Sequence, residues 1–306
     1  MQAITLKQLR YVDALATHRH FGRAAEACAV SQPALSMQIR EIEAALGVDL
    51  FERRARLVQP TGFGEDFIAR IRDILRSVDE LEYLALAARQ GFLGRLRLGV
   101  IPTVAPYLLP SILGGLANAY AGLDVQVRET VTPRLVEGLE TGQLDMAIVA
   151  LPLSEPGFDQ FVLFEEAFVL VRPASDAGKP VPAPRALLDM KLLLLEEGHC
   201  FRDQALAFCS LDARTPLPRK SLDGSSLSTL VQMVGAGIGV TLIPELAVQV
   251  ETRSAPVSLA RFASPQPSRT IGVVWRKANP MAAQLAEIAG VVRGAAAKLR
   301  RDQAAG

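Results

Sequence analysis

The sequence predicts a mixed α/β protein in which a small all-α unit and one long helix precede a larger region of alternating strands and helices. Apolar residues recur at helical spacing through residues 4–45, and a heptad pattern follows them. From residue 95 onward, short apolar runs alternate with helical segments. The 306 residues are enough for two or three domains.

Composition and charge narrow the class of protein. Half of the residues are hydrophobic and 21% are charged, as in a globular protein with packed cores. The net charge of the chain is +1, and residues 1–60 carry 8 Lys or Arg against 6 Asp or Glu. Because this charge is too small to create a strong positive field, the prediction of DNA binding must rest on a sequence motif. The start of the chain lacks the apolar core of a signal peptide, and no run reaches the length of a membrane span. We therefore expect a cytoplasmic protein with no membrane contact.

The first 46 residues have the spacing of a helix-turn-helix. Helices are expected over 4–17 and 21–28, and a third from Ser31 to about residue 45. Ser31 is a favourable N-cap, and Pro33 falls in the first turn, where its missing N–H is tolerated. The apolar stripe of the third helix consists of Leu35, Ile39, Ile42 and Leu46.

Polar residues on this third helix are suited to reading DNA. Gln32, Ser36 and Arg40 are spaced by four and share one face. Such side chains contact base edges in the major groove, and Arg53 and Arg56, in a two-stranded wing expected over 48–65, are placed for phosphate or minor-groove contacts. The alternative is a small helical bundle with an ordinary polar surface.

A long helix is expected over residues 61–89. Its apolar residues alternate at spacings of four and three, which is the pattern of a helix that pairs with another helix. These residues are Phe67, Ile71, Ile74, Val78, Leu81, Ala85 and Ala88. The alternative is a helix packed on its own domain. We therefore divide the chain into a DNA-binding domain (1–60), a dimerising linker helix (61–90) and a regulatory domain (91–306).

The regulatory region alternates strands with helices, which predicts parallel sheets, two of them over this length. Strands are expected at 95–101, 123–128, 144–150, 167–172, 191–195, 239–243 and 271–275. Helices are expected at 105–119, 133–141, 225–236 and 279–300. The strand expected at 271–275 predicts that the chain returns to the first sheet. Lobe I therefore spans about 95–165 and 269–306, and lobe II spans about 166–268. A cleft is expected between the two lobes.

Two of the three cysteines lie nine positions apart in "GHCFRDQALAFC", residues 198–209. If this segment is one helix, about 13.5 Å of axis separates Cys200 from Cys209 at ~1.5 Å per residue. A disulfide needs Cα atoms within roughly 7 Å. The two thiols therefore cannot bond while the segment stays helical or extended, and forming the bond would force it to rebuild.

The surroundings of the two thiols differ. His199, Arg202 and a helix start would lower the pKa of Cys200, whereas Cys209 has the sequence context of a buried thiol that could capture a sulfenic acid. Two alternatives are open: both cysteines are inert, or they form a zinc site with His199, a weak match because two ligands are adjacent and no CxxC occurs. Cys28 is expected to be structural.

The stretch "FGRAAEACAVSQPALSMQIREIEAALGVDLFERRARLVQPTGFGE" (21–65) resembles the DNA-binding domain of the LysR-type transcriptional regulators. The later organisation is similar as well, so the resemblance covers the whole chain. It implies a winged helix-turn-helix, dimerisation through the linker helix, often a tetramer, and a two-lobed regulatory domain like a periplasmic binding protein. One departure is Phe63-Gly64, where many members carry Ala-Gly; we expect little consequence.

The cysteine segment "EEGHCFRDQALAFC" resembles the redox segment of the hydrogen-peroxide-sensing branch of that family. So do "VIPTVAPYLLP", "SSLSTLVQMVGAGIGVTLIP" and "RTIGVVWR". The resemblance implies that Cys200 is the peroxidatic cysteine and Cys209 the resolving cysteine. The residues that it implies around the peroxide are Thr103, Thr132, His199, Asp203 and Arg269. Phe201 stands where relatives often carry another apolar residue.

These residue types suit peroxide chemistry. A threonine hydroxyl both donates and accepts hydrogen bonds, and an arginine stabilises a thiolate without titrating. Thr103 and Thr132 follow predicted strand ends, where an α/β protein places its ligands. The alternative for both threonines is an ordinary helix N-cap.

The combined prediction is a homotetrameric, peroxide-responsive transcriptional activator that is not an enzyme and needs no cofactor or metal. Its expected partners are double-stranded operator DNA, hydrogen peroxide, RNA polymerase and a thiol reductant that resets the disulfide. One alternative is a LysR-type regulator that binds a small metabolite in the cleft. A second is a thiol peroxidase with a DNA-binding appendage.

Overall fold

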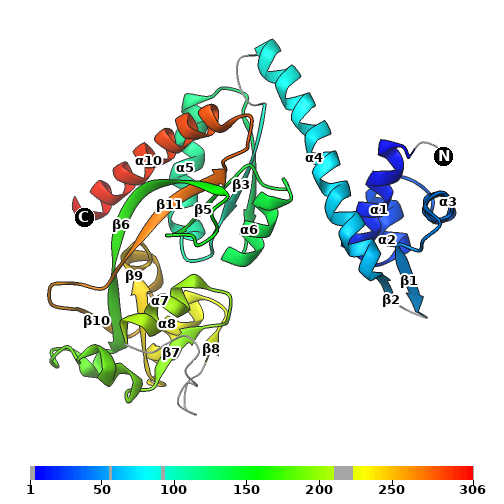
Figure 1. The fold of residues 1–306 in the computed structure, drawn as a ribbon. Coiled ribbons are helices and arrows are strands. Elements are labelled where there is room, and N and C mark those ends of the chain that lie inside the picture. Colours follow the sequence, from blue (N-terminus) through cyan, green and yellow to red (C-terminus); the bar gives the residue numbers. More distant parts are fainter. Residues whose placement is uncertain (1–3, 55–56, 91–93, 210–222, 306) are drawn as a thin grey trace. The chain divides into compact units, whose positions relative to one another are not determined.

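A computed structural model describes residues 4–54, 57–90, 94–209 and 223–305 (Figure 1). The chain is mixed α/β, as predicted, and it divides into two compact units, residues 1–91 and 92–306. Within the described residues, no helix has both the length and the apolar character that crossing a membrane requires.

The first unit contains the three expected helices. They are α1 (Leu6–His18), α2 (Phe21–Ala27) and α3 (Gln32–Leu46), followed by a hairpin of β1 (Phe51–Arg54) and β2 (Leu57–Pro60). Ser31 is the N-cap of α3, and its hydroxyl accepts a hydrogen bond from the amide of Ala34, so the predicted cap is confirmed. The stripe Leu35, Ile39 and Ile42 is buried in a core that all three helices share.

The long helix α4 (Gly62–Gln90) changes its surroundings along its length. Near its start, Ile68, Ile71 and Leu75 are buried in the core of the first unit. Ile74, between Ile71 and Leu75, is 47% exposed, and Leu81, further along, is 65% exposed. One face of the first part therefore packs on its own unit, as in the alternative given above, while Ile74 and Leu81 of the predicted seam stay exposed. The side chains of Ala85 and Ala88 lie outside the described residues.

The described residues of the second unit form nine strands with helices between them. Its first part contains β3 (Arg95–Val100), α5 (Ala105–Ala119), β4 (Asp124–Glu129), α6 (Thr132–Glu140), β5 (Met146–Leu151) and β6 (Phe158–Pro173). Its second part contains β7 (Leu192–Leu195), α7 (Cys200–Phe208), β8 (Asp223–Gly224), α8 (Leu227–Gly235), β9 (Val240–Pro244), η3 (Glu245–Ala247), α9 (Val248–Glu251) and β10 (Val257–Arg261). The chain ends with β11 (Ser268–Arg276) and α10 (Ala282–Ala305).

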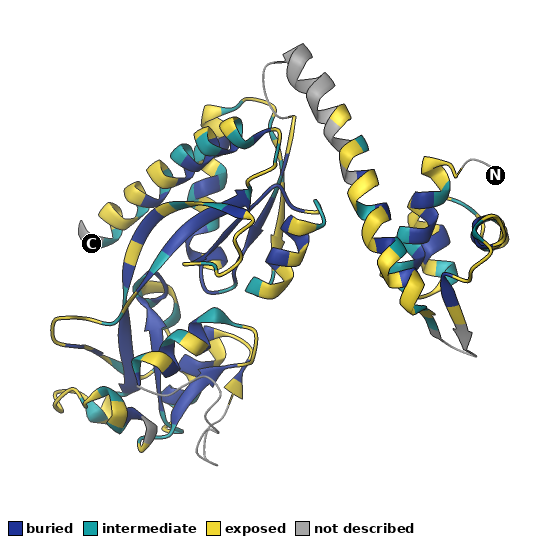
Figure 2. Cartoon of the chain, viewed as in Figure 1, coloured by how far each residue is buried: buried dark blue, intermediate teal, exposed yellow. Residues whose placement is uncertain are grey.

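Apart from β10, which pairs with β6 off this path, the described strands form one continuous path rather than two separate parallel sheets, so that expectation is wrong. Parallel pairs occur within each lobe, β3 with β4 and β5, and β7 with β8 and β9. The 16-residue β6 joins them, because it pairs with β11 along its first part and with β9 and β10 at its end, all antiparallel. The predicted return is confirmed, since β11 pairs with β5. Figure 2 shows that most of these strands are buried.

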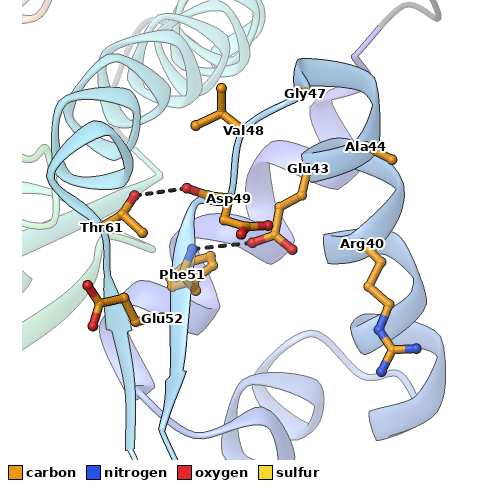
Figure 3. Close-up of a pocket in the computed structure, with 9 residues that line it drawn as sticks. All are labelled: Arg40, Glu43, Ala44, Gly47, Val48, Asp49, Phe51, Glu52 and Thr61. Carbon is orange, nitrogen blue, oxygen red and sulfur yellow. Dashed lines mark hydrogen bonds between the residues drawn. The ribbon is translucent and has the colours of Figure 1, made fainter.

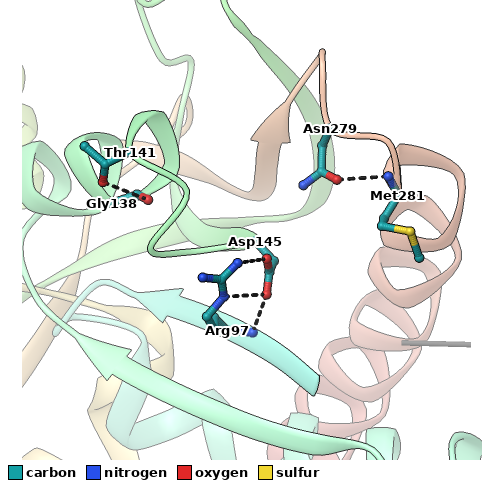
Figure 4. Close-up of polar contacts among 6 residues, drawn as sticks. All are labelled: Arg97, Gly138, Thr141, Asp145, Asn279 and Met281. Atoms are coloured by element: carbon teal, nitrogen blue, oxygen red, sulfur yellow. Dashed lines mark hydrogen bonds and ion pairs between the residues drawn. The ribbon is translucent and has the colours of Figure 1, made fainter. Parts of the chain in front are cut away.

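Polar contacts fasten the ends of elements in the first lobe (Figure 4). Asp145 precedes β5 and accepts from both the side chain and the backbone N–H of Arg97 on β3, each at 2.7 Å. The hydroxyl of Thr141 donates to the carbonyl of Glu137, at the end of α6. This charge-assisted, bidentate pair links Arg97 on β3 to the start of β5, the parallel strand beside it.

Candidate functional site

The helix α7 carries the cysteine pair at its two ends. Cys200 is its first residue and Cys209 its C-cap, and both thiols are free. The nine-residue separation therefore spans about 13.5 Å of helix axis at ~1.5 Å per residue. That exceeds the roughly 7 Å between Cα atoms that a disulfide allows. The segment is helical in the reduced protein, and this helix excludes the bond.

Cys209 lies in an apolar setting. It is fully buried, and this burial raises the pKa of its thiol to about 11. The preceding residue, Phe208, packs edge-on against Phe262 with 4.8 Å between ring centroids. At neutral pH the thiol is therefore protonated and a poor nucleophile while α7 stays packed.

Arg202 fastens α7 to the neighbouring strands. Its Nη1 donates to the carbonyl oxygen of Leu195 on β7 at 2.7 Å and to Asp223 on β8 at 2.8 Å. From the sequence, this guanidinium was expected to supply positive charge near the Cys200 thiol. The structure instead uses it to hold the helix against the edge of the second lobe.

A buried polar cluster joins β6, β11 and the residues after β3. Arg269 Nη1 donates to the Thr103 hydroxyl at 2.7 Å, and Nη2 donates to the Thr103 carbonyl at 3.1 Å. Glu166 pairs with the same guanidinium at 2.6 Å, and both side chains of this pair are fully buried. Two residues predicted for the site, Thr103 and Arg269, are thus in direct contact.

The two threonines are not helix caps. The N-caps of α5 and α6 are Val104 and Val131, and neither makes a side-chain capping bond. Thr132 is the first residue of α6, and its hydroxyl is buried without a hydrogen-bond partner among the described residues. A buried hydroxyl in this state costs free energy unless a ligand or water satisfies it. The capping alternative is therefore wrong.

Contacts bring the starts of α6 and α7 together with Arg269. A Cβ built on Gly198, the residue before His199, would lie 3.6 Å from Cγ2 of Val131. On the other side of Cys200, the ring of Phe201 lies 5.1 Å from the Arg269 guanidinium. Thr132, the Cys200 turn and the Arg269 cluster therefore border one region. The φ of +92° at Gly198 favours glycine in the turn that starts α7.

The two titratable neighbours of Cys200 differ in exposure. His199 is half-buried, and burial lowers its pKa although Glu196 opposes the shift, so its imidazole is neutral at pH 7. Asp203 lies on the exposed side of α7. Partial burial of its carboxyl raises its pKa; the charge of Glu197 adds to this shift and that of Arg202 opposes it. Among the side chains that the structure describes, neither has a hydrogen-bond partner.

The recognition helix presents the predicted polar face. Gln32 and Arg40 are exposed and Ser36 is half-buried, and Pro33 lies in the first turn of α3. Figure 3 shows Arg40 on this helix beside a pocket between α3 and the hairpin. There the buried Glu43 accepts hydrogen bonds from the backbone N–H groups of Leu50 and of Phe51, the first residue of β1.

Several predicted residues lie partly or wholly beyond what the structure describes. Arg56 is outside the described residues, and so is the side chain of Arg53. Cys28, predicted to be structural, is the half-buried C-cap of α2, where burial and Asp13 raise its pKa. Within the described part of the chain, no group of three His, Cys, Asp or Glu side chains could hold a metal ion.

Sequence reasoning missed Glu166. Its signal was available, because "FEEAFVLV" places an acidic residue on the same face as the buried Phe164 and Phe168. A charge on the buried face of a strand indicates a charged partner. The register supplies that partner, since Glu166 lies directly opposite Arg269.

Comparison with known proteins gives consistent matches over both units. Residues 6–65 match the family described as bacterial regulatory helix-turn-helix protein, lysR family, and residues 89–297 match the LysR substrate binding domain. A "probable hydrogen peroxide-inducible genes activator" from Streptomyces viridosporus is 45% identical, over 95% of this chain and 94% of that protein. The "DNA-binding transcriptional dual regulator OxyR" of Escherichia coli K12 is 39% identical, over 95% of each chain.

Solved structures are similar along nearly the whole chain. A full-length OxyR variant from Pseudomonas aeruginosa has a TM-score of 0.75 and 36% identity, and the match covers 96% of each chain. A hydrogen-peroxide-bound OxyR mutant from Corynebacterium glutamicum has a TM-score of 0.65 and 34% identity, covering 96% of this chain and 93% of the other.

Proposed function

Because this chain belongs to the LysR family of helix-turn-helix regulators, in its OxyR branch, we propose that hydrogen peroxide switches its DNA binding through a disulfide between Cys200 and Cys209. The protein is a transcriptional regulator and not an enzyme. The observation that carries the proposal is the placement of the two thiols at opposite ends of one helix. A covalent bond between them requires a second backbone state.

The first step is attack by the Cys200 thiolate on one peroxide oxygen. The O–O bond breaks, the sulfur loses two electrons and becomes a sulfenic acid, and the other oxygen leaves as hydroxide that a proton from solvent converts to water. Thr103, Thr132 and Arg269 surround the peroxide and supply hydrogen bonds to its oxygens. The neutral His199 and the carboxyl of Asp203 complete the surroundings of the thiol.

The second step rebuilds α7. The Cys209 sulfur attacks the sulfenic sulfur, the S–S bond forms, and a second hydroxide leaves and is protonated to water. Because burial keeps Cys209 protonated in the packed helix, its attack follows the opening of α7. A thiol reductant restores both thiols and allows the helix to form again.

The rebuilt segment alters how subunits contact one another and so the spacing of paired DNA-binding units. In this proposal the DNA-binding domain (1–60) reads DNA and the linker helix (61–90) pairs two chains in a dimer. The regulatory domain (91–306) senses peroxide, and two dimers form a tetramer. Within the DNA-binding unit, Ser31, Gln32, Pro33, Ser36 and Arg40 with the wing residues Arg53 and Arg56 contact the operator. Spacing matters because a dimeric reader needs its half-sites about one helical turn, or a multiple of it, apart. The activated protein then engages RNA polymerase.

A footprinting experiment with three variants tests this function. Reduced and peroxide-treated protein would be compared on promoter DNA for the wild type, Cys200→Ser and the matched control Cys28→Ser. We expect the wild type and Cys28→Ser to change their footprint, and Cys200→Ser to keep the reduced footprint at wild-type affinity. A peroxide response that persists in Cys200→Ser would contradict the proposal and favour a different effector.

A further inference from the structure

Glu166 is the centre of a buried network that involves both lobes. Its Oε1 accepts a hydrogen bond from Arg269 Nε at 2.8 Å and forms an ion pair with Nη2 of the same guanidinium at 2.6 Å. Its Oε2 accepts from the backbone N–H of Leu246 in η3 at 3.2 Å. Glu166 lies on β6, the strand that joins the lobes, directly opposite Arg269 on β11. The carboxylate therefore uses both of its oxygens to hold groups from different elements.

The network sets the direction in which Arg269 points. With Nε and Nη2 bound by Glu166, the guanidinium turns Nη1 toward the hydroxyl of Thr103. That hydroxyl accepts this bond, so its own proton is left to donate elsewhere. Among the described residues, no acceptor for the Thr103 proton is found. The hydroxyl is thus prepared as a hydrogen-bond donor.

We infer that Glu166 is a positioning residue for the peroxide reaction: it holds Arg269 against Thr103 so that the Thr103 hydroxyl donates to the oxygen that leaves. This inference rests on the proposed function. As the thiolate of Cys200 takes one OH from the peroxide, the departing hydroxide gains negative charge. A donor already oriented toward that oxygen lowers the barrier without reorganising, and solvent then protonates the hydroxide.

Glutamine at this position distinguishes a positioning role from simple packing. Glu166→Gln keeps the shape of the side chain, but one oxygen becomes an NH₂ group that cannot accept a hydrogen bond. Because Arg269 and Leu246 both need an acceptor, the amide satisfies only one of them. Glu165→Gln is a matched control, since Glu165 is the adjacent residue and its side chain is exposed.

The experiment compares two reactions of the same thiol. Rates of Cys200 with hydrogen peroxide and with iodoacetamide would be measured by stopped-flow mixing across a pH series in the full-length protein. Alkylation expels iodide, which needs no hydrogen-bond donor, so it reports thiolate formation alone. At the pH where alkylation levels off, we expect Glu166→Gln to lower the peroxide rate about tenfold or more and to leave the alkylation rate near that of the wild type. Glu165→Gln should match the wild type in both reactions.

A double-mutant cycle with Thr103→Val tests whether Glu166 acts through Thr103. If it does, Glu166→Gln lowers the peroxide rate far less in the Thr103→Val background than in the wild type. Independent, multiplicative losses, or a fall in both reactions together, would overturn the inference. Should Glu166→Gln fail to fold, Glu166→Asp provides the same comparison. Aspartate keeps the negative charge, but its shorter side chain withdraws the carboxylate from Arg269 and Leu246.

The outcome for the wild type separates this inference from the proposed function. If wild-type Cys200 reacts with peroxide no faster than a free cysteine, the proposed function fails and the inference fails with it. If the wild type reacts quickly and Glu166→Gln keeps its full peroxide rate, only the positioning role of Glu166 is refuted.

Discussion

The opening of α7 should control how quickly the disulfide forms, and a glycine on its exposed face tests this directly. Ala207 is an exposed residue near the end of the nine-residue helix, so replacing it with glycine removes no buried contact. Glycine costs a helix about 1 kcal/mol relative to alanine, which raises the population of the open segment about fivefold. Ala207→Gly should therefore speed disulfide formation about fivefold and leave the first oxidation step unchanged.

The assay follows both steps after mixing with one equivalent of peroxide. Samples quenched with an alkylating reagent at successive times would be analysed by mass spectrometry for thiol, sulfenic acid and disulfide. Ala297→Gly is the matched control, because it places the same defect on the exposed face of α10, which the switch does not open. Equal disulfide rates in Ala207→Gly and the wild type would refute the reasoning that helix opening precedes the bond.

Three further predictions concern the thiol, the recognition helix and the linker helix. Burial raises the pKa of the Cys209 thiol to about 11, so the packed helix favours the neutral thiol. The packed helix therefore has its full stability relative to the open segment below the ordinary thiol pKa of about 8.5. It loses stability as pH rises toward 11. The disulfide-forming step should therefore keep accelerating to about pH 11 in stopped-flow measurements, and a plateau near pH 8.5 would contradict this. Ser31→Ala removes the cap of α3 and should lower the free energy of unfolding of the first unit by about 1 kcal/mol in urea titrations, whereas an unchanged midpoint would count against the cap. Leu81→Lys should weaken self-association measured by sedimentation, because Leu81 is 65% exposed in the predicted seam, and an unaltered oligomer would exclude pairing there.

Much of the helical structure was predictable because its signals are local. The cap at Ser31 and the buried stripe through Leu35 and Ile39 are both readable from spacing, and the structure confirms them. The full length of the strand β6 was not predictable, because its first part, "FDQFVLFEE", mixes pairs of polar residues with an apolar run and lacks a regular period, so only its apolar second part was predicted. The strand β10 was missed for a similar reason, since "VSLAR" is short and mixed in character.

The candidate site was likewise predictable only where its signals are local. The positions of Thr103 and Thr132 after strand ends followed from sequence pattern, and both strands do end three residues earlier, at Val100 and Glu129. The contact of Arg269 with Thr103 and Glu166 could not be derived, because it depends on the register of β6 against β11 across more than a hundred residues of chain. Non-local register is set by the whole packed sheet and leaves little trace in any one segment.

The central claim is that peroxide links Cys200 to Cys209 within one chain. The most direct test is a mass-spectrometric map of the cysteines in the full-length protein after one equivalent of hydrogen peroxide. We predict a peptide pair joined at Cys200 and Cys209, with the loss of two hydrogens, while Cys28 stays open to alkylation. An unmodified pair, or a crosslink that involves Cys28, would contradict the account.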